Sequence, residues 1–113
     1  MPNDSFPEII KALPRADISV DGIKAWIAQG KEFQIVFFEI EAGVLLPPHS
    51  HSAQYGIVIE GEMTLTISGK AKHYRKGDTY YIPEGAIHQA EIHTFFRALD
   101  FFAEPARYKP KPA

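Results

Sequence analysis

From Ile23 onward, short runs of apolar or alternating residues are separated by glycine-containing turns. Runs of four to eight residues with this pattern are typical of β-strands. The 8 phenylalanines and 5 tyrosines also favour β structure. Eight short strands with so little helix predict a sandwich or barrel, so we expect an all-β fold. The predicted strands cover residues 23–28, 33–40, 55–59, 63–68, 72–75, 79–82, 90–93 and 97–102.

The segment before the strands has the pattern of a short helix. Ser5 and Glu8 form a Ser-x-x-Glu capping box, and Pro7 is suited to a first helical turn. Pro14 then ends the helix, which is predicted to cover residues 5–13.

The length of 113 residues predicts one domain with a single core. We expect an N-terminal extension with the short helix over residues 1–22 and a β-barrel over residues 23–104. The prolines and lysines after residue 104 predict a loose C-terminal tail over residues 105–113. The pattern indicates no repeat and no second domain.

Composition and charge exclude several classes of function. The formal net charge is −2 and no basic stripe is present, so a nucleic-acid partner is not expected. No apolar stretch reaches the roughly 18 residues of a membrane span, and no signal peptide is visible at the start, so the expected location is cytoplasmic. The chain has no cysteine, and any metal must therefore be bound by nitrogen and oxygen ligands.

Two histidines lie two residues apart directly after Pro47-Pro48, where a strand is expected to begin. Side chains at positions i and i+2 of a strand share a face, so His49 and His51 would point in the same direction and could bind one metal ion together. The alternative is a pair of polar residues in an exposed loop.

The glycines around these histidines carry a further pattern. Gly43 is followed after five residues by His49, then by His51 and Gln54, and finally by Gly61. A second run has Gly77, Pro83, Gly85 and His88 in the order Gly-x5-Pro-x-Gly-x2-His.

These two runs resemble the two signature motifs of the cupin superfamily, in that order and with a separation of 15 residues. The resemblance covers residues 43–92, and the final Asn of the second motif is replaced by Ile92. It implies a double-stranded β-helix, or jelly-roll barrel, with His49, His51 and His88 binding a metal ion inside one mouth. It also implies a homodimer.

The first motif departs from the family at its fourth ligand. The usual Glu position, counted forward from His51, is Tyr55, whereas counting back from Gly61 reaches Gln54. We favour Gln54, because a loop absorbs a deletion more easily than a barrel strand absorbs a register slip. Tyr55, or a water molecule completing a three-histidine site, are the alternatives.

Gln in place of Glu has a consequence for the metal and its ligand. Three imidazoles and an amide oxygen leave the charge of a divalent ion uncompensated, which favours an anionic small-molecule ligand. Such a ligand set suits Zn, Fe, Ni, Mn or Cu.

The end of the chain, around Asp100 and Arg107, resembles small cupins that linearise unsaturated uronates in pectin and alginate breakdown. That resemblance implies proton transfer by Asp100 and carboxylate binding by Arg107, although the match needs one extra residue before Arg107. The alternative is that Asp100 is a polar residue at a strand end and Arg107 a solvated tail residue.

The remaining histidines and aromatic residues have simpler interpretations. We expect His73 and His93 at the surface, because His73 lies in a lysine-rich hairpin and His93 alternates away from His88. Aromatic residues in strands belong more often to a core or a subunit interface than to a substrate-binding surface. We expect this of Trp26, Phe37, Tyr80 and Tyr81.

These observations favour a metal-dependent enzyme that acts on a small anionic sugar acid or keto acid by isomerisation, tautomerisation or ring opening. An Fe-dependent dioxygenase and a non-catalytic ligand-binding barrel are the alternatives, because this fold hosts many activities.

Overall fold

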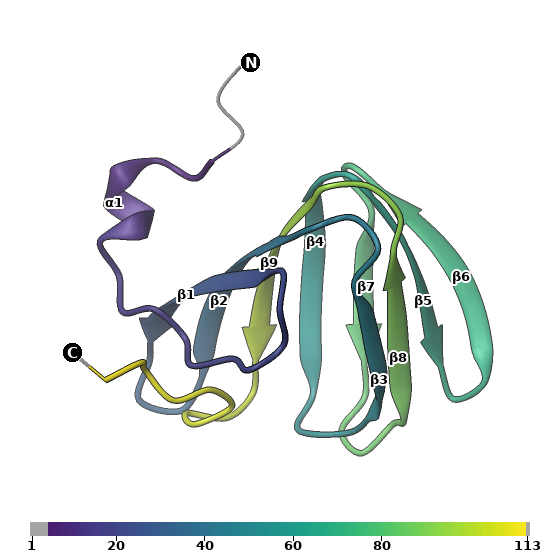
Figure 1. Cartoon of the computed structure of the whole chain (residues 1–113). Coiled ribbons are helices and arrows are strands. Elements are labelled where there is room, and N and C mark those ends of the chain that lie inside the picture. Colours follow the sequence, from purple (N-terminus) through teal and green to yellow (C-terminus); the bar gives the residue numbers. More distant parts are fainter. Residues whose placement is uncertain (1–4, 113) are drawn as a thin grey trace.

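The computed structural model describes residues 5–112, and within this range the chain forms nine strands and one short helix (Figure 1). The all-β prediction is confirmed. Residues 1–4 of the predicted N-terminal extension and residue 113 of the predicted tail lie outside the described range. The strands are β1 (Ile23–Gln29), β2 (Gln34–Ile40), β3 (Leu45–His49), β4 (Gln54–Glu60), β5 (Glu62–Ile67), β6 (Lys70–Arg75), β7 (Thr79–Ile82), β8 (His88–Ile92) and β9 (Phe96–Phe102).

The strands form two antiparallel sheets that face each other as a jelly-roll barrel. One sheet has the order β1-β2-β9-β4-β7 and the other β3-β8-β5-β6, so strands distant in sequence become neighbours. The loops β3–β4 and β7–β8 and the end of β9 all lie at one end of the barrel, drawn at the bottom of Figure 1. The turn after β4 closes the opposite end at Gly61, where a Cβ would collide with the carbonyl of Phe95.

Hydrophobic side chains from the two inner faces form one core. Val36, Phe38 and Phe102 come from the five-stranded sheet, and Leu65 and Ile92 come from the four-stranded sheet. Burial of each such side chain contributes about 1.5–3 kcal/mol to folding. The described residues include no helix long and apolar enough to cross a membrane.

Strand β3 was not among the predicted strands. It contains Pro47 and Pro48, and proline supplies no N–H to a ladder. The structure tolerates them because β3 is an edge strand that pairs only with β8, and because the register shifts between Leu46 and His49.

The N-terminal helix is shorter than predicted. Helix α1 covers Glu8–Lys11 and its N-cap is Pro7, so the predicted start of the helix at Ser5 is wrong. Phe6 instead packs edge-to-face on Trp26 and Phe37. These contacts hold the N-terminal segment against the five-stranded sheet.

Residues 105–111 do not form the loose tail that was predicted. The N–H of Lys111 donates to the carbonyl of Arg15 (2.7 Å), and the N–H of Asp17 donates to the carbonyl of Lys109 (2.8 Å). A β-bridge joins Ala16 and Pro110. The two terminal segments therefore pair with each other beside the barrel.

Candidate metal centre

Three histidines meet at the end of the barrel where β3 ends and β8 begins. His49 is the last residue of β3 and pairs in register with His88, the first residue of β8. His51 lies in the β3–β4 loop and not on a strand, so the expected sharing of a strand face is wrong for it. The N–H of Gly85 donates to the carbonyl of His51 (2.9 Å) and joins the two loops.

The three imidazoles are close enough to share one ion. Ring centroids are 4.2 Å apart for His49 and His88, 4.7 Å for His51 and His88, and 5.3 Å for His49 and His51. One nitrogen from each ring lies within 4.8 Å of the other two. Nitrogen–metal bonds of about 2.0–2.1 Å require only a modest further closure.

Hydrogen bonds on the other ring nitrogens prepare the histidines for a metal. The Nδ1 atoms of His49, His51 and His88 lie 2.8, 2.7 and 2.9 Å from the carbonyls of Pro47, Ser52 and Ala86. A carbonyl only accepts, so each Nδ1 carries the proton and each Nε2 keeps a free lone pair. In histidine–metal sites, the ring nitrogen that does not bind the metal usually donates a hydrogen bond to such an acceptor. The three free Nε2 atoms therefore fit a divalent ion.

Burial also keeps two of these rings neutral. Desolvation, with a smaller contribution from the nearby Arg107, lowers the pKa of His51 to about 4, although the hydrogen bond to the Ser52 carbonyl opposes the shift. Desolvation and His49 lower the pKa of His88 in the same way. Metal binding requires unprotonated imidazoles, so these shifts favour it at neutral pH.

Gln54 lines the same cavity, whereas Tyr55 does not. In β4, Gln54 faces inward with Gly56 and Val58, while the side chain of Tyr55 is 51% exposed on the outer face. Gln54 Nε2 donates to Asp100 Oδ1 (2.9 Å), which leaves the amide oxygen free. The inward orientation is as expected, and Tyr55 points away from the histidines.

Asp100 is fully buried in the middle of the sheet, so it is not a strand-end polar residue. Its Oδ1 also accepts a hydrogen bond from the hydroxyl of Tyr80 (2.7 Å). Burial raises the pKa of Asp100 to about 6, although the hydrogen bonds from Gln54 and Tyr80 oppose the rise. A carboxyl with this pKa exchanges protons readily near neutral pH.

Arg107 also lines the cavity and is not a solvated tail residue. Its guanidinium lies 4.4 Å from the ring centroid of Tyr108 and 5.7 Å from that of Phe102. Its Nε is buried without a hydrogen-bond partner. Arg107 forms none of the ion pairs found among the described residues. The charge is therefore available to an anion in the cavity.

Sequence reasoning missed the residues that hold Arg107 in place. Gln34, only 1% exposed, donates from Nε2 to the carbonyl of Tyr108 (2.9 Å) and accepts from its N–H (3.0 Å). Gln29 Nε2 donates to the carbonyl of Pro105 (2.7 Å). No local pattern marks these glutamines, because their partners are more than 70 residues away.

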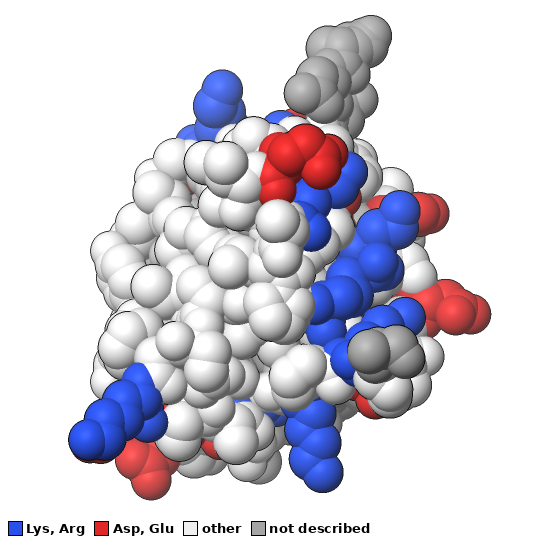
Figure 2. Space-filling model, turned by 90° about the vertical axis from the view of Figure 1, so that its left-hand side faces the viewer, with Lys and Arg blue, Asp and Glu red and all other residues white. Residues whose placement is uncertain are grey.

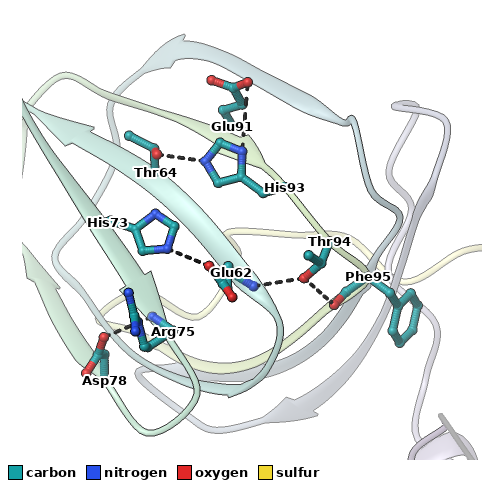
Figure 3. Close-up of polar contacts among 9 residues, drawn as sticks. All are labelled: Glu62, Thr64, His73, Arg75, Asp78, Glu91, His93, Thr94 and Phe95. Atoms are coloured by element: carbon teal, nitrogen blue, oxygen red, sulfur yellow. Dashed lines mark hydrogen bonds and ion pairs between the residues drawn. The ribbon is translucent and has the colours of Figure 1, made fainter.

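His73 and His93 lie outside the site, as predicted. They stack on the exposed outer face of the four-stranded sheet, with ring centroids 5.6 Å apart (Figure 3). His73 Nε2 contacts Glu62 Oε1 at 2.7 Å, and His93 Nε2 contacts Thr64 Oγ1 at the same distance. These contacts satisfy the two rings at the surface.

The paired terminal segments carry further positive charge. Figure 2 shows this side of the molecule, with Lys and Arg side chains along one edge of a broad uncharged area. Arg15, Lys109 and Lys111 belong to these segments. Their charges favour the approach of an anion.

Comparison with solved structures shows the same architecture in known cupins. The RmlC-like cupin from Shewanella frigidimarina is 28% identical, with a TM-score of 0.76 over 95% of this chain and 94% of that chain. KdgF from Halomonas sp. is 24% identical, with a TM-score of 0.74 over 86% of this chain and 92% of that chain. Oxalate decarboxylase from Bacillus subtilis, described with Mn(II) centres, is 18% identical, with a TM-score of 0.73 over 86% of this chain and 29% of that chain.

No curated protein sequence matches the chain significantly. The profile of the cupin domain, in contrast, matches residues 36–102, which is more than half of the chain. This range contains both glycine–histidine motifs, all three clustered histidines, Gln54 and Asp100. The chain therefore belongs to the cupin family.

Proposed function

We propose that this cupin is a metal-dependent enzyme that isomerises, tautomerises or ring-opens a small anionic sugar acid or keto acid. The observation that carries the proposal is the position of Asp100. Its buried carboxyl, with a pKa of about 6, shares one cavity with the three histidines and Arg107. A proton-transfer group, a metal site and an anion-binding group thus line the same space.

Each group has a chemical role in such a reaction. A divalent ion held by His49, His51 and His88 would supply Lewis-acid polarisation of a substrate oxygen. Asp100 takes up a proton from the substrate carbon or oxygen and returns it to a neighbouring atom. Arg107 binds the substrate carboxylate. Its buried Nε, which has no hydrogen-bond partner, supports this assignment.

Gln54 is the proposed fourth ligand of the metal. Because its amide nitrogen donates to Asp100, its oxygen is the atom left for the ion. The same hydrogen bond links the metal site to the proton-transfer group. The set of three imidazoles and one oxygen suits Zn, Fe, Ni, Mn or Cu.

We also propose a homodimer formed through the outer face of the five-stranded sheet. Tyr55 pairs in register with both Tyr81 and Phe101, and these three side chains are 51%, 58% and 39% exposed. Phe33 stacks on Phe101 with ring centroids 5.1 Å apart. A contiguous aromatic patch of this kind marks an interaction surface.

The metal site is tested first by the metal content of protein purified without added metal or chelator. We expect close to one equivalent in the wild type, loss of the metal in His49→Ala and weaker retention in Gln54→Ala. His73→Ala removes a surface histidine and is the matched control. A wild-type protein that binds no metal after reconstitution would contradict the proposal.

The enzymatic role is tested with the metal-loaded protein and a panel of sugar acids and keto acids. Asp100→Asn should abolish turnover by removing the proton acceptor while the metal stays bound. An unchanged rate would remove Asp100 from the mechanism. Tight binding of the acids without turnover by the wild type would instead indicate a non-catalytic ligand-binding protein.

A further inference from the structure

The cavity at the metal site continues along the inside of the barrel. Its volume is about 260 Å³. The polar groups that line it are gathered at one end, because His49 pairs with His88 and Gln54 with Phe102 in the strand register. Arg107, on the segment after β9, lines the same end.

The opposite end of the cavity is lined by hydrophobic side chains. Met63 pairs with Ile92, and Ile40 pairs with Phe96, at the ends of their strands far from the histidines. Ile92 lies four positions after His88 in β8, which corresponds to about 13 Å along the strand. The cavity thus runs from a charged end to an apolar end within one barrel.

None of the cavity-lining residues near Met63 and Phe96 has a polar side chain. The polar side chains among the lining residues belong to the metal end or its border: the histidines, Gln54, Tyr80, Gln89, Asp100, Arg107 and Tyr108. The hydroxyl of Tyr80 already donates to Asp100. A hydroxyl buried at the apolar end would lose its bonds to water without replacement, which is costly.

We propose that the ligand of this site is a small carboxylic acid with an apolar body, such as a branched 2-oxo acid, and not a polyhydroxylated sugar acid. The inference rests on the proposed function, because it places the carboxylate at the histidines and Arg107. The hydrocarbon part then lies toward Met63 and Phe96 and is removed from water there. The apolar half of the cavity selects among the acids that the charged half attracts.

The test is calorimetric titration of the metal-loaded protein with pyruvate, 4-methyl-2-oxopentanoate and galacturonate. The three acids share a carboxylate and differ in the body that follows it. We expect 4-methyl-2-oxopentanoate to bind at least tenfold more tightly than pyruvate, and galacturonate to bind no more tightly than pyruvate. Nuclear Overhauser contacts between the ligand methyl groups and the Met63 methyl group are expected as well.

A pair of variants tests the apolar end separately. Met63→Gln should remove the preference for the branched acid while metal content and pyruvate affinity stay unchanged. Met63→Leu, which keeps the position apolar, should retain the preference. If the glutamine variant does not fold, the comparison of the three acids with the wild type still decides the matter.

The outcomes separate this inference from the proposed function. Equal binding of pyruvate and the branched acid, or tighter binding of galacturonate, with metal and pyruvate still bound, would overturn the inference alone. A protein that binds metal but none of the three acids would overturn it together with the proposed substrate class. Absence of metal would remove the basis of both.

Discussion

Gly56 lies between Asp100 and Tyr80 in the five-stranded sheet, opposite each of them in the register. A Cβ at this position would overlap Asp100 Oδ1 and the ring of Tyr80. The absence of a side chain lets the Tyr80 hydroxyl reach across β4 and donate to Asp100. A single glycine in a buried strand thus makes room for the candidate proton-transfer group.

The raised pKa of Asp100 predicts a pH-dependent cost to folding. Its pKa is 3.8 in an exposed carboxyl and about 6 in the folded protein, so the folded state binds more protons between these values. The contribution of Asp100 to the free energy of unfolding of the metal-free protein should therefore fall as the pH rises from about 4 to 7, whereas the lowered pKa values of His51 and His88 act in the opposite direction. The contribution of Asp100 is roughly 3 kcal/mol.

Asp100→Asn removes this contribution, because asparagine does not ionise. Metal-free Asp100→Asn should resemble the wild type near pH 4 and become progressively more stable than it toward pH 8. Chemical denaturation of both proteins at pH 4, 6 and 8 measures the difference. A difference that is the same at every pH would mean that Asp100 titrates normally.

At the scale of elements, the start of β2 controls the position of the C-terminal segment. Gln34 forms two hydrogen bonds with the backbone of Tyr108, and its Nε2 also donates to Gln29 Oε1 (2.9 Å). Ser52 Oγ donates to Glu104 Oε2 (2.5 Å) and ties the loop of His51 to the start of the same segment. These bonds place Arg107 at the mouth of the cavity.

Gln34→Leu should release this segment while keeping the hydrophobic surroundings of the position. It removes the partners of the Tyr108 N–H and carbonyl, and we expect a loss of about 2 kcal/mol in the free energy of unfolding. The amide of Tyr108 should exchange with solvent faster. Gln29→Ala removes the single exposed hydrogen bond from Gln29 Nε2 to the carbonyl of Pro105 in the same segment and should cost less. Unchanged exchange at Tyr108 would show that other contacts hold the segment.

At the scale of the whole molecule, the outer faces of the two sheets differ in character. The five-stranded sheet exposes the patch of Tyr55, Tyr81 and Phe101, whereas the four-stranded sheet exposes the polar cluster around His73 and His93 (Figure 3). A contiguous aromatic patch on the five-stranded sheet favours association through that face.

Tyr81→Lys should dissociate the dimer, because it places a charge in the centre of an apolar contact. Sedimentation equilibrium is the measurement, and we expect a dimeric wild type and a monomeric variant with unchanged metal content. Ala71→Lys puts the same charge on an exposed position of β6 in the other sheet and should remain dimeric. A monomeric wild type, or a dimeric Tyr81→Lys protein, would contradict the interface.

Much of the strand arrangement could be predicted from patterns that are local in the sequence. Alternation and turn glycines indicated eight of the nine strands, because strand alternation and tight turns depend on residues only a few positions apart. The histidine cluster was implied by the resemblance of the Gly43–His49–His51 and Gly77–His88 spacings to the cupin motifs.

Only the tertiary structure decided the surroundings of the site. Pro47-Pro48 became part of a strand because β3 lies at a sheet edge. Asp100 became buried through partners 20 and 46 residues away, and the predicted tail became ordered through Gln34, 74 residues from Tyr108. Such contacts depend on which strands become neighbours when the barrel closes, and burial and hydrogen bonding across those neighbours leave no periodic trace in the sequence.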